Sequence, residues 1–150
     1  MIRERIADET KTAMKSGDKA RLSTLRMVSS AIKNAEIEAR TGGKGDLSDE
    51  ALLPLLQKLV KQRQESAELY DKGARPELAA NERAEIAVIQ SFLPQQMSED
   101  EVRAAIAEAI KEAGATSAKD MGKVMAALKA KHSGKMDFAK ASGVVKGMLG

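Results

Sequence analysis

The 150-residue chain contains no cysteine and a single histidine. Without cysteine it forms no disulfide, no thiolate metal site and no thiol nucleophile. A triad-type hydrolase would need His132 as its base, and no strand–serine–helix motif exists to present the serine. No carboxylates accompany His132 at the spacings of a metal site. The sequence therefore predicts no metal, no cofactor and no autonomous catalysis.

Aromatic residues and long apolar runs are also scarce. Two phenylalanines, one tyrosine and no tryptophan leave the core to Leu, Ile, Val, Met and Ala, which suits the packing of helices. Nowhere do about 18 apolar residues follow one another, as a membrane span requires. The first residues, MIRERIADETKTAMKSG, lack the apolar centre of a signal peptide. We therefore expect a cytoplasmic protein that has no membrane partner.

Apolar residues recur at helical spacing through almost the whole chain, and no strand-like alternation of any length appears. Ser98 is followed three residues later by Glu101, which is the pattern of a helix-starting capping box. The start and stop signals predict seven helices, which begin at Ile2, Asp18, Ser48, Pro76, Ser98, Ser117 and Asp137. The predicted fold class is all-α.

The segment Leu93-Pro94-Gln95-Gln96 is the best candidate for a domain boundary, because proline disfavours helix in the residue before it. We expect an N-terminal four-helix hairpin or bundle domain over residues 1–94 and a small three-helix domain over 95–150. The segment TGGKGD (41–46) lacks the spacing of a phosphate-binding loop and follows a helix, so it is interpreted as a flexible connection.

Positive charge is concentrated at the C-terminal end. From Lys119 to Gly150 there are seven lysines and two aspartates, whereas the whole chain carries a net charge of only +3. One interpretation is a phosphate-binding surface, in which lysines clamp nucleic-acid phosphates and a turn allows close backbone approach. The other is that these side chains are the ordinary solvent faces of two amphipathic helices. The candidate nucleic-acid-binding residues are Lys123, Lys129, Lys131, His132, Gly134, Lys135, Lys140 and Lys146.

Three segments carry a resemblance to a known family. They are RLSTLRMVSSAIKNAEIEAR (21–40), LVKQRQESAELYDKGARPELAANERAEIAVIQSFLPQQMSEDE (59–101) and MGKVMAALKAKHSGKMDFAKASGVVKGML (121–149). Together they resemble a YqeY-like protein of the GatB/YqeY family over essentially the whole chain. The resemblance implies kinship with the C-terminal helical region of the tRNA-dependent amidotransferase B subunit, which is associated with tRNA binding. It also implies a description as a carbon–nitrogen ligase with glutamine as amido donor.

The chain departs from that amidotransferase in one important respect. It lacks the large body that activates the substrate carboxylate, and the glutaminase nucleophile belongs to another subunit. Only the tail pattern carries over, in which Val124 and Met125 fall on the apolar stripe. The matching residues are Gly122, Lys123, Val124, Met125, Lys129, Gly134 and Lys135.

The leading hypothesis is a non-catalytic protein that binds tRNA or another structured RNA through its C-terminal helices. The absence of tryptophan weighs against recognition by base stacking and favours contact with the backbone and shape of a folded RNA. An alternative is a protein-interaction adaptor whose N-terminal groove, with Leu25, Ile32 and Leu56, receives a partner helix. A third is an accessory of amide transfer that needs a partner subunit for the chemistry.

Overall fold

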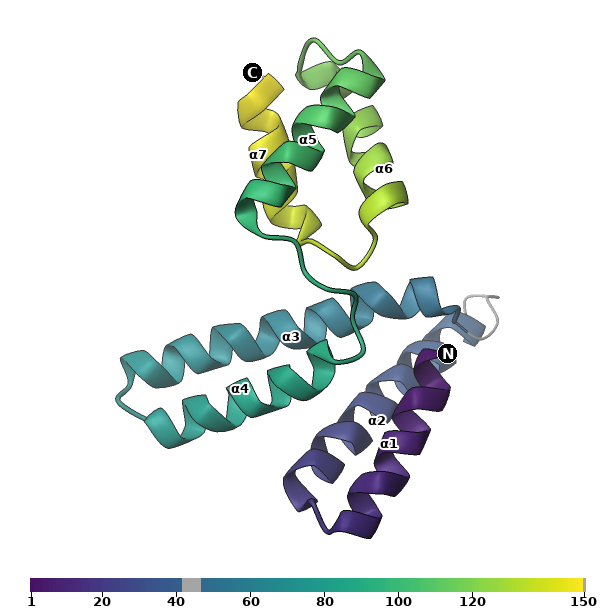
Figure 1. Ribbon diagram of the computed structural model, residues 1–150, viewed down its shortest axis with the longest axis vertical. Helices are drawn as coiled ribbons and strands as arrows, with labels where there is room; N and C mark the ends of the chain where they lie inside the picture. The colour runs from purple at the N-terminus through teal and green to yellow at the C-terminus, as the bar shows by residue number, and fades with distance from the viewer. Residues whose placement is uncertain (42–46, 150) are drawn as a thin grey trace. The chain divides into compact units, whose positions relative to one another are not determined.

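The computed structural model describes residues 1–41 and 47–149. Over these residues the chain forms seven α-helices and one short 3₁₀ turn, without any strand (Figure 1). The all-α prediction is therefore confirmed. The predicted connection TGGKGD lies, from residue 42 to residue 46, outside the described residues. The helices group into two compact units, Met1–Leu93 and Pro94–Gly150, which we call unit 1 and unit 2.

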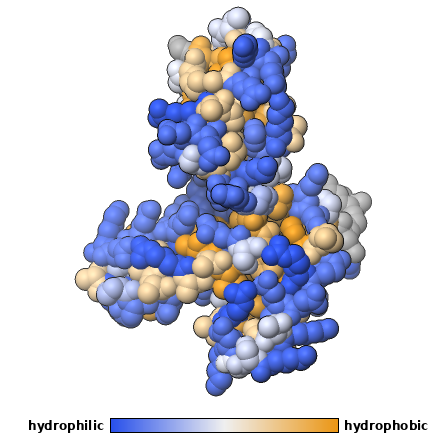
Figure 2. All heavy atoms as spheres, viewed as in Figure 1, coloured by the Kyte–Doolittle hydropathy of each residue, from blue (hydrophilic) through white to orange (hydrophobic). Residues whose placement is uncertain are grey.

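Unit 1 consists of two helical hairpins. Helices α1 (Ile2–Ser16) and α2 (Lys19–Thr41) form the first, and α3 (Asp49–Lys72) and α4 (Pro76–Gln90) form the second (Figure 1). Helix α2 also packs against α4, which joins the hairpins. In Figure 2, hydrophobic residues of unit 1 are visible mainly where the two hairpins meet, and hydrophilic residues cover their outer parts.

The boundaries of these helices follow from the capping residues that the sequence predicts. Gly17 ends α1 in the left-handed conformation, with φ of 73°. Asp18 then caps α2, since its Oδ1 accepts a hydrogen bond from the Arg21 amide at 3.1 Å. Ser48 caps α3 in the same way, through the Ala51 amide at 3.2 Å.

The core of unit 1 draws on all four helices, and Leu25, Leu52, Leu56 and Ile89 are completely buried within it. Leu25 and Leu56 are 0% exposed and Ile32 is 5% exposed. These residues were expected to line an open groove for a partner helix. They pack inside the unit instead, because the apolar stripes of the two hairpins cover each other, so they are not available to a partner.

Unit 2 is a three-helix unit made of α5 (Glu99–Ala113), α6 (Met121–His132) and α7 (Phe138–Leu149). Its separate core has Ile106, Val124, Leu128 and Val145 at its centre, all at most 1% exposed. The helix expected to begin at Ser117 opens with a 3₁₀ turn, Ala118–Asp120, before α6 proper.

Both ends of the capping box predicted for α5 are formed. The Glu101 amide donates to the Ser98 hydroxyl at 3.2 Å, and the Ser98 amide donates to the Glu101 carboxylate at 3.1 Å. These bonds satisfy two backbone donors that would otherwise lack a partner at the helix start. At the start of α7, Asp137 Oδ1 accepts from the Ala139 amide at 2.9 Å.

The segment before α5 is bound to the turn between α6 and α7. The Met97 amide donates to the Lys135 carbonyl at 2.9 Å, and the Gln96 side-chain amide donates to the Gly134 carbonyl at 2.7 Å. These two bonds connect residues 38 positions apart in the chain. Gln96 and Met97 therefore belong structurally to unit 2. Among the helices that the structure describes, none has the length and apolarity needed to cross a membrane.

Candidate nucleic-acid interface

The lysines of α6 differ in where they point. Lys123 and Lys129 are exposed, and between them on the same side of the helix lie the exposed small residues Gly122 and Ala126. This side faces away from the core of unit 2, since about 100° of rotation per residue places it opposite the buried Val124 and Leu128. The solvent side of α6 is thus low in relief and flanked by two positive charges.

Helix α7 repeats this arrangement. Lys140 and Lys146 are exposed, and the exposed small residues between and beside them are Ala139, Gly143 and Gly147. Helix α6 packs against α7 within the unit. Four of the five exposed lysines of the two helices, Lys123, Lys129, Lys140 and Lys146, form no ion pair with any residue that the structure describes.

The glycines on these two faces are not required by the fold. A Cβ atom added at Gly122, Gly143 or Gly147 would meet no atom within 4 Å. None of the three has a positive φ angle. A glycine inside a helix lowers stability by roughly 0.5–1 kcal/mol relative to alanine. The three glycines therefore lower the stability of the helices, and no packing contact in unit 2 requires them.

Lys131 is committed to a partner inside the unit. Its Nζ donates to both carboxylate oxygens of Glu112 on α5, at 3.0 Å and 2.8 Å. The hydrogen bond from Lys131 lowers the pKa of Glu112, and the same bond raises the pKa of Lys131. The sequence gives no sign of this pair, because the two residues are 19 positions apart and on different helices.

His132, Gly134 and Lys135 form the turn between α6 and α7. The His132 carbonyl accepts from the Lys135 amide at 3.0 Å, and Gly134 has φ of 76°, which favours glycine. Gly134 is buried and its carbonyl is bound by Gln96. The turn was expected to let nucleic acid approach its backbone at Gly134. The structure gives this glycine a conformational role and leaves the Lys135 side chain, which is half-exposed, as the outward-facing element of the turn.

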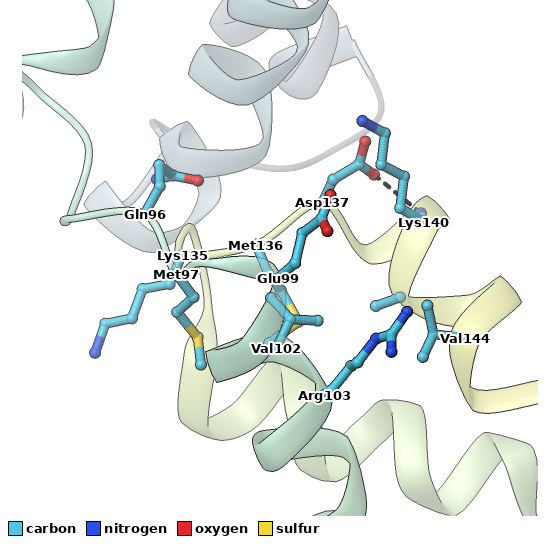
Figure 3. Close-up of a pocket in the computed structure, with 11 residues that line it drawn as sticks. Gln96, Met97, Glu99, Val102, Arg103, Lys135, Met136, Asp137, Lys140 and Val144 are labelled. Atoms are coloured by element: carbon cyan, nitrogen blue, oxygen red, sulfur yellow. Dashed lines mark hydrogen bonds between the residues drawn. The ribbon is translucent and has the colours of Figure 1, made fainter. Parts of the chain in front are cut away.

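A cavity of about 360 Å³ lies next to this turn, within unit 2 (Figure 3). Its walls are the segment 96–97, the first two turns of α5, residues 135–137 and the first two turns of α7. Its basic residue Arg103 and its methionines, Met97 and Met136, are not among the candidate residues predicted from the sequence. These residues come from three separate segments, so no local pattern could have connected them.

Two properties of the ionisable side chains that the structure describes bear on function, namely metal-ligand grouping and shifted pKa values. No three His, Asp or Glu side chains among residues 1–41 and 47–149 lie close enough together to hold a metal ion. The pKa shifts belong to surface ion pairs, helix caps and the chain's amino end. Arg83, for example, lowers the pKa of Asp71 by hydrogen bonding, and the Ser98 amide does the same for Glu101.

Comparison with known proteins gives consistent results over most of the chain. A family model described as Yqey-like protein matches residues 3–149. Three relatives share the name "Altered inheritance of mitochondria protein 41, mitochondrial". That of Lachancea thermotolerans is 39% identical over 106 residues, which cover 69% of this chain and 55% of the relative. That of Pyrenophora tritici-repentis is 28% identical over 134 residues, covering 86% and 72%. That of Meyerozyma guilliermondii is 39% identical over 85 residues, covering 57% and 42%.

These names contradict the cytoplasmic location expected from the sequence, since each relative is named as a mitochondrial protein. The expectation rested on absences, namely of cysteine, of an apolar leader and of a membrane span. Such absences are shared by proteins of several compartments and cannot distinguish them. The chain spans about half the length of the first of these relatives.

Proposed function

Because the chain belongs to the YqeY-like family, whose model spans residues 3–149, we propose that it binds tRNA or another structured RNA through α6 and α7. It has no catalytic activity of its own in this proposal. The observation that carries the proposal is the pairing of exposed lysines with exposed small residues on both helices. Phosphates approach such a surface closely, because no bulky side chain separates them from the lysine amines or the helix backbone.

The distribution of charge within unit 2 supports an RNA surface over an evenly solvated one. The exposed side chains of α5 include five carboxylates and two basic groups, Arg103 and Lys111, whereas α6 and α7 carry lysines and no carboxylate. A surface that served only solubility would gain from mixing the two signs. Separation of the signs instead gives the unit one face that attracts phosphate and one that repels it. The carboxylates are Glu99, Asp100, Glu101, Glu108 and Glu112.

The family resemblance narrows the proposal further. The tail pattern resembles that of the amidotransferase B subunit, so tRNA is the RNA that we propose, and any glutamine-dependent carbon–nitrogen ligase chemistry would come from a partner subunit. The names of the relatives support a mitochondrial setting for this role. The adaptor alternative loses support, since the residues named for its groove are buried.

We also infer that the two compact units are independently folding domains, close to the boundaries 1–94 and 95–150. Each unit has a hydrophobic core of its own, and the two cores share no residue. A core of this kind is what a chain segment needs in order to fold separately.

The test is fluorescence anisotropy of labelled tRNA with the full chain over a series of salt concentrations. Two double variants remove charge from the proposed surface, Lys123→Gln with Lys129→Gln, and Lys140→Gln with Lys146→Gln. If each lysine neutralises one phosphate, each double variant lowers the slope of log affinity against log salt by roughly 1.5. Affinity for tRNA should also fall at every salt concentration.

The matched control is Lys11→Gln with Lys15→Gln on α1, which removes the same charge from unit 1. Both lysines are exposed. This control should leave the salt slope unchanged. Equal losses in all three double variants would mean that only net charge matters, and the proposal of a defined surface would fail. So would an absence of tRNA binding near physiological salt.

A further inference from the structure

The cavity beside the α6–α7 turn has an apolar interior. Met136 and Ala141 are 3% and 1% exposed, and Met97, Val102 and Val144 complete the apolar lining. Its volume of about 360 Å³ lies within the roughly 300–1,000 Å³ of small-ligand sites. The cavity therefore has room for a flat apolar group of the size of a nucleobase.

Basic side chains stand on opposite sides of the cavity mouth. Arg103 lines the cavity from α5 and Lys140 from α7, and Figure 3 shows the Arg103 guanidinium directed toward Val144 and the Lys140 amine beside Asp137 at the outer edge. Neither side chain forms an ion pair with a described residue. Lys135 is a third basic residue of the lining, although its side chain points away from Met136 and the interior in Figure 3.

Two carboxylates, Asp137 and Glu99, also line the cavity, and they differ in how the neighbouring helix stabilises them. Asp137 is engaged by α7, since its Oδ1 accepts from the amides of Ala139 at 2.9 Å and Lys140 at 3.3 Å. Glu99 lies in the first turn of α5, where the helix dipole stabilises its charge. Three cations against these two carboxylates leave the lining with a net positive charge.

A nucleotide matches this combination better than a peptide does. Methionine thioethers contact aromatic rings favourably, and an arginine plane stacks on a base in the absence of aromatic side chains. Amines at the mouth can hold the phosphate that follows the base. Strand addition of a peptide would need unpaired backbone groups, which helical walls do not supply, and a helical peptide would not use the basic side chains at the edge of the cavity as a phosphate does.

We propose that this cavity receives one unpaired nucleotide of the bound RNA, with the base on Met97, Met136 and Val144 and the phosphate near Lys140. The inference deepens the proposed function and rests on it. It also gives Arg103 a role, which is to stack on that base. Arg103 is not one of the residues of the tail pattern. The basic faces of α6 and α7 would supply affinity for any RNA backbone, and the cavity would select RNA with an unpaired base.

The experiment uses the full chain with ¹³C-labelled methionine methyl groups. The protein is titrated with two RNAs of equal length, a hairpin with an unpaired loop and a blunt duplex. We expect the methyl signals of Met97 and Met136 to shift with the hairpin and not with the duplex. Met14 on α1 is exposed and belongs to unit 1, so its signal serves as the internal reference and should not move.

Affinity provides the second measurement. The wild-type chain should bind the hairpin roughly tenfold more tightly than the duplex, as expected for one well-placed base. Val144→Met places a longer side chain at the cavity and should abolish this preference while duplex binding remains. Val88→Met is the same change at a half-buried helical position of unit 1 and should leave the preference intact.

The outcomes separate the two proposals. Salt-sensitive binding of both RNAs with equal affinity, without movement of Met97 and Met136, would overturn the nucleotide cavity and leave the RNA-binding function standing. Failure of both RNAs to bind would overturn the proposed function and the cavity inference with it. If Val144→Met does not fold, the methionine shifts of the wild-type protein still decide between these results.

Discussion

Ala74 is the one described non-glycine residue with a positive φ, of 56°, and it lies in the turn between α3 and α4. The preceding residue is Gly73, whose φ of −84° suits any amino acid. The glycine is thus placed one residue before the position whose backbone favours it. A non-glycine residue in this region costs roughly 1–2 kcal/mol. Replacing it by glycine removes this cost, but part of the gain is lost because glycine makes the unfolded chain more flexible.

We therefore predict that Ala74→Gly stabilises the protein. The free energy of unfolding should rise by about 0.5–1 kcal/mol, and urea denaturation followed by circular dichroism measures it. Ala80→Gly, inside α4 and exposed, is the matched control. It should lower the free energy of unfolding by up to roughly 1 kcal/mol, because glycine there only weakens the helix. The same sign for both variants would contradict this explanation.

Lys131 gives a second prediction at this scale. Because its amine is held by Glu112, Lys131→Gln should reduce tRNA affinity less than Lys129→Gln does on the same helix. Glu112→Gln should increase tRNA affinity, since it removes a carboxylate and frees the Lys131 amine. Anisotropy at fixed salt measures both. A larger loss for Lys131→Gln than for Lys129→Gln would show that RNA displaces Glu112.

Residues that act on their own neighbours could be predicted from the sequence, and residues that act across helices could not. Asp18, Ser48 and Ser98 cap helices because each bonds an amide three residues later, which is a local relation. The partner of Lys131 depends on how α5 and α6 pack. The periodicity of each helix shows which side is apolar, and it leaves open which polar side chains meet.

At the scale of one helix, the capping box of α5 makes stability depend on pH. The hydrogen bond from the Ser98 amide lowers the pKa of Glu101 in the folded state. Its contribution to stability is therefore complete above the ordinary glutamate pKa and is lost as pH falls through the lowered value. Glu101→Gln keeps an acceptor at this position and does not titrate.

We expect the wild-type protein to be more stable than Glu101→Gln at neutral pH and to lose this advantage in acid. Thermal unfolding of both proteins over a series of pH values, from neutral to below the ordinary glutamate pKa, checks the prediction. A difference that stayed constant across the series would show that the Glu101 carboxylate titrates alike in the folded and unfolded states.

A substitution at Gly143 tests whether the exposed side of α7, with its lysines and small residues, binds RNA. Its added Cβ would meet no atom within 4 Å, so Gly143→Ala should stabilise unit 2 by up to roughly 1 kcal/mol. The same variant should weaken tRNA binding, because the new methyl group holds phosphates away from the helix. Melting temperature and anisotropy measured on one preparation must change in opposite directions. A more stable variant with unchanged affinity would remove the glycines from the interface.

The positions of the helices were predictable because start signals and apolar periodicity agree along the chain. Helix α4 begins at Pro76 and α7 follows Asp137, as the sequence predicts. The apolar stripe of a helix does not show which other helix packs against it. Leu25, Ile32 and Leu56 would line a groove if the hairpins stood apart, and they are core residues because the hairpins pack together.

The whole molecule, with its two cores, should unfold in two steps. Ser48→Ala removes the cap of α3 in unit 1, and Ser98→Ala removes the cap of α5 in unit 2. Each should destabilise its own unit by about 1 kcal/mol. In calorimetry we expect two transitions, of which each variant lowers one and leaves the other in place. A single transition lowered equally by both variants would show that the units unfold together.

The candidate site was predictable at this scale only in outline. The concentration of lysines at the C-terminal end pointed to unit 2, and Lys123, Lys129, Lys140 and Lys146 are exposed there. The cavity could not be predicted from the sequence, because Met97, Arg103 and Lys140 line one cavity only when segment 96–97 is bound to the α6–α7 turn. Periodicity describes the face of one helix, and a cavity is a property of several.

The bonds from Gln96 and Met97 to residues 134 and 135 also set an order for events on the ribosome. Every residue in the core of unit 1 precedes position 94, so this unit can fold while the rest of the chain is still being made. Segment 96–97 must wait for its partners until 38 more residues have been added, roughly 2–8 s at ordinary rates of synthesis. During that interval α5 exposes its apolar face on the nascent chain. The RNA binding proposed for unit 2 therefore requires that the α6–α7 turn has already been made.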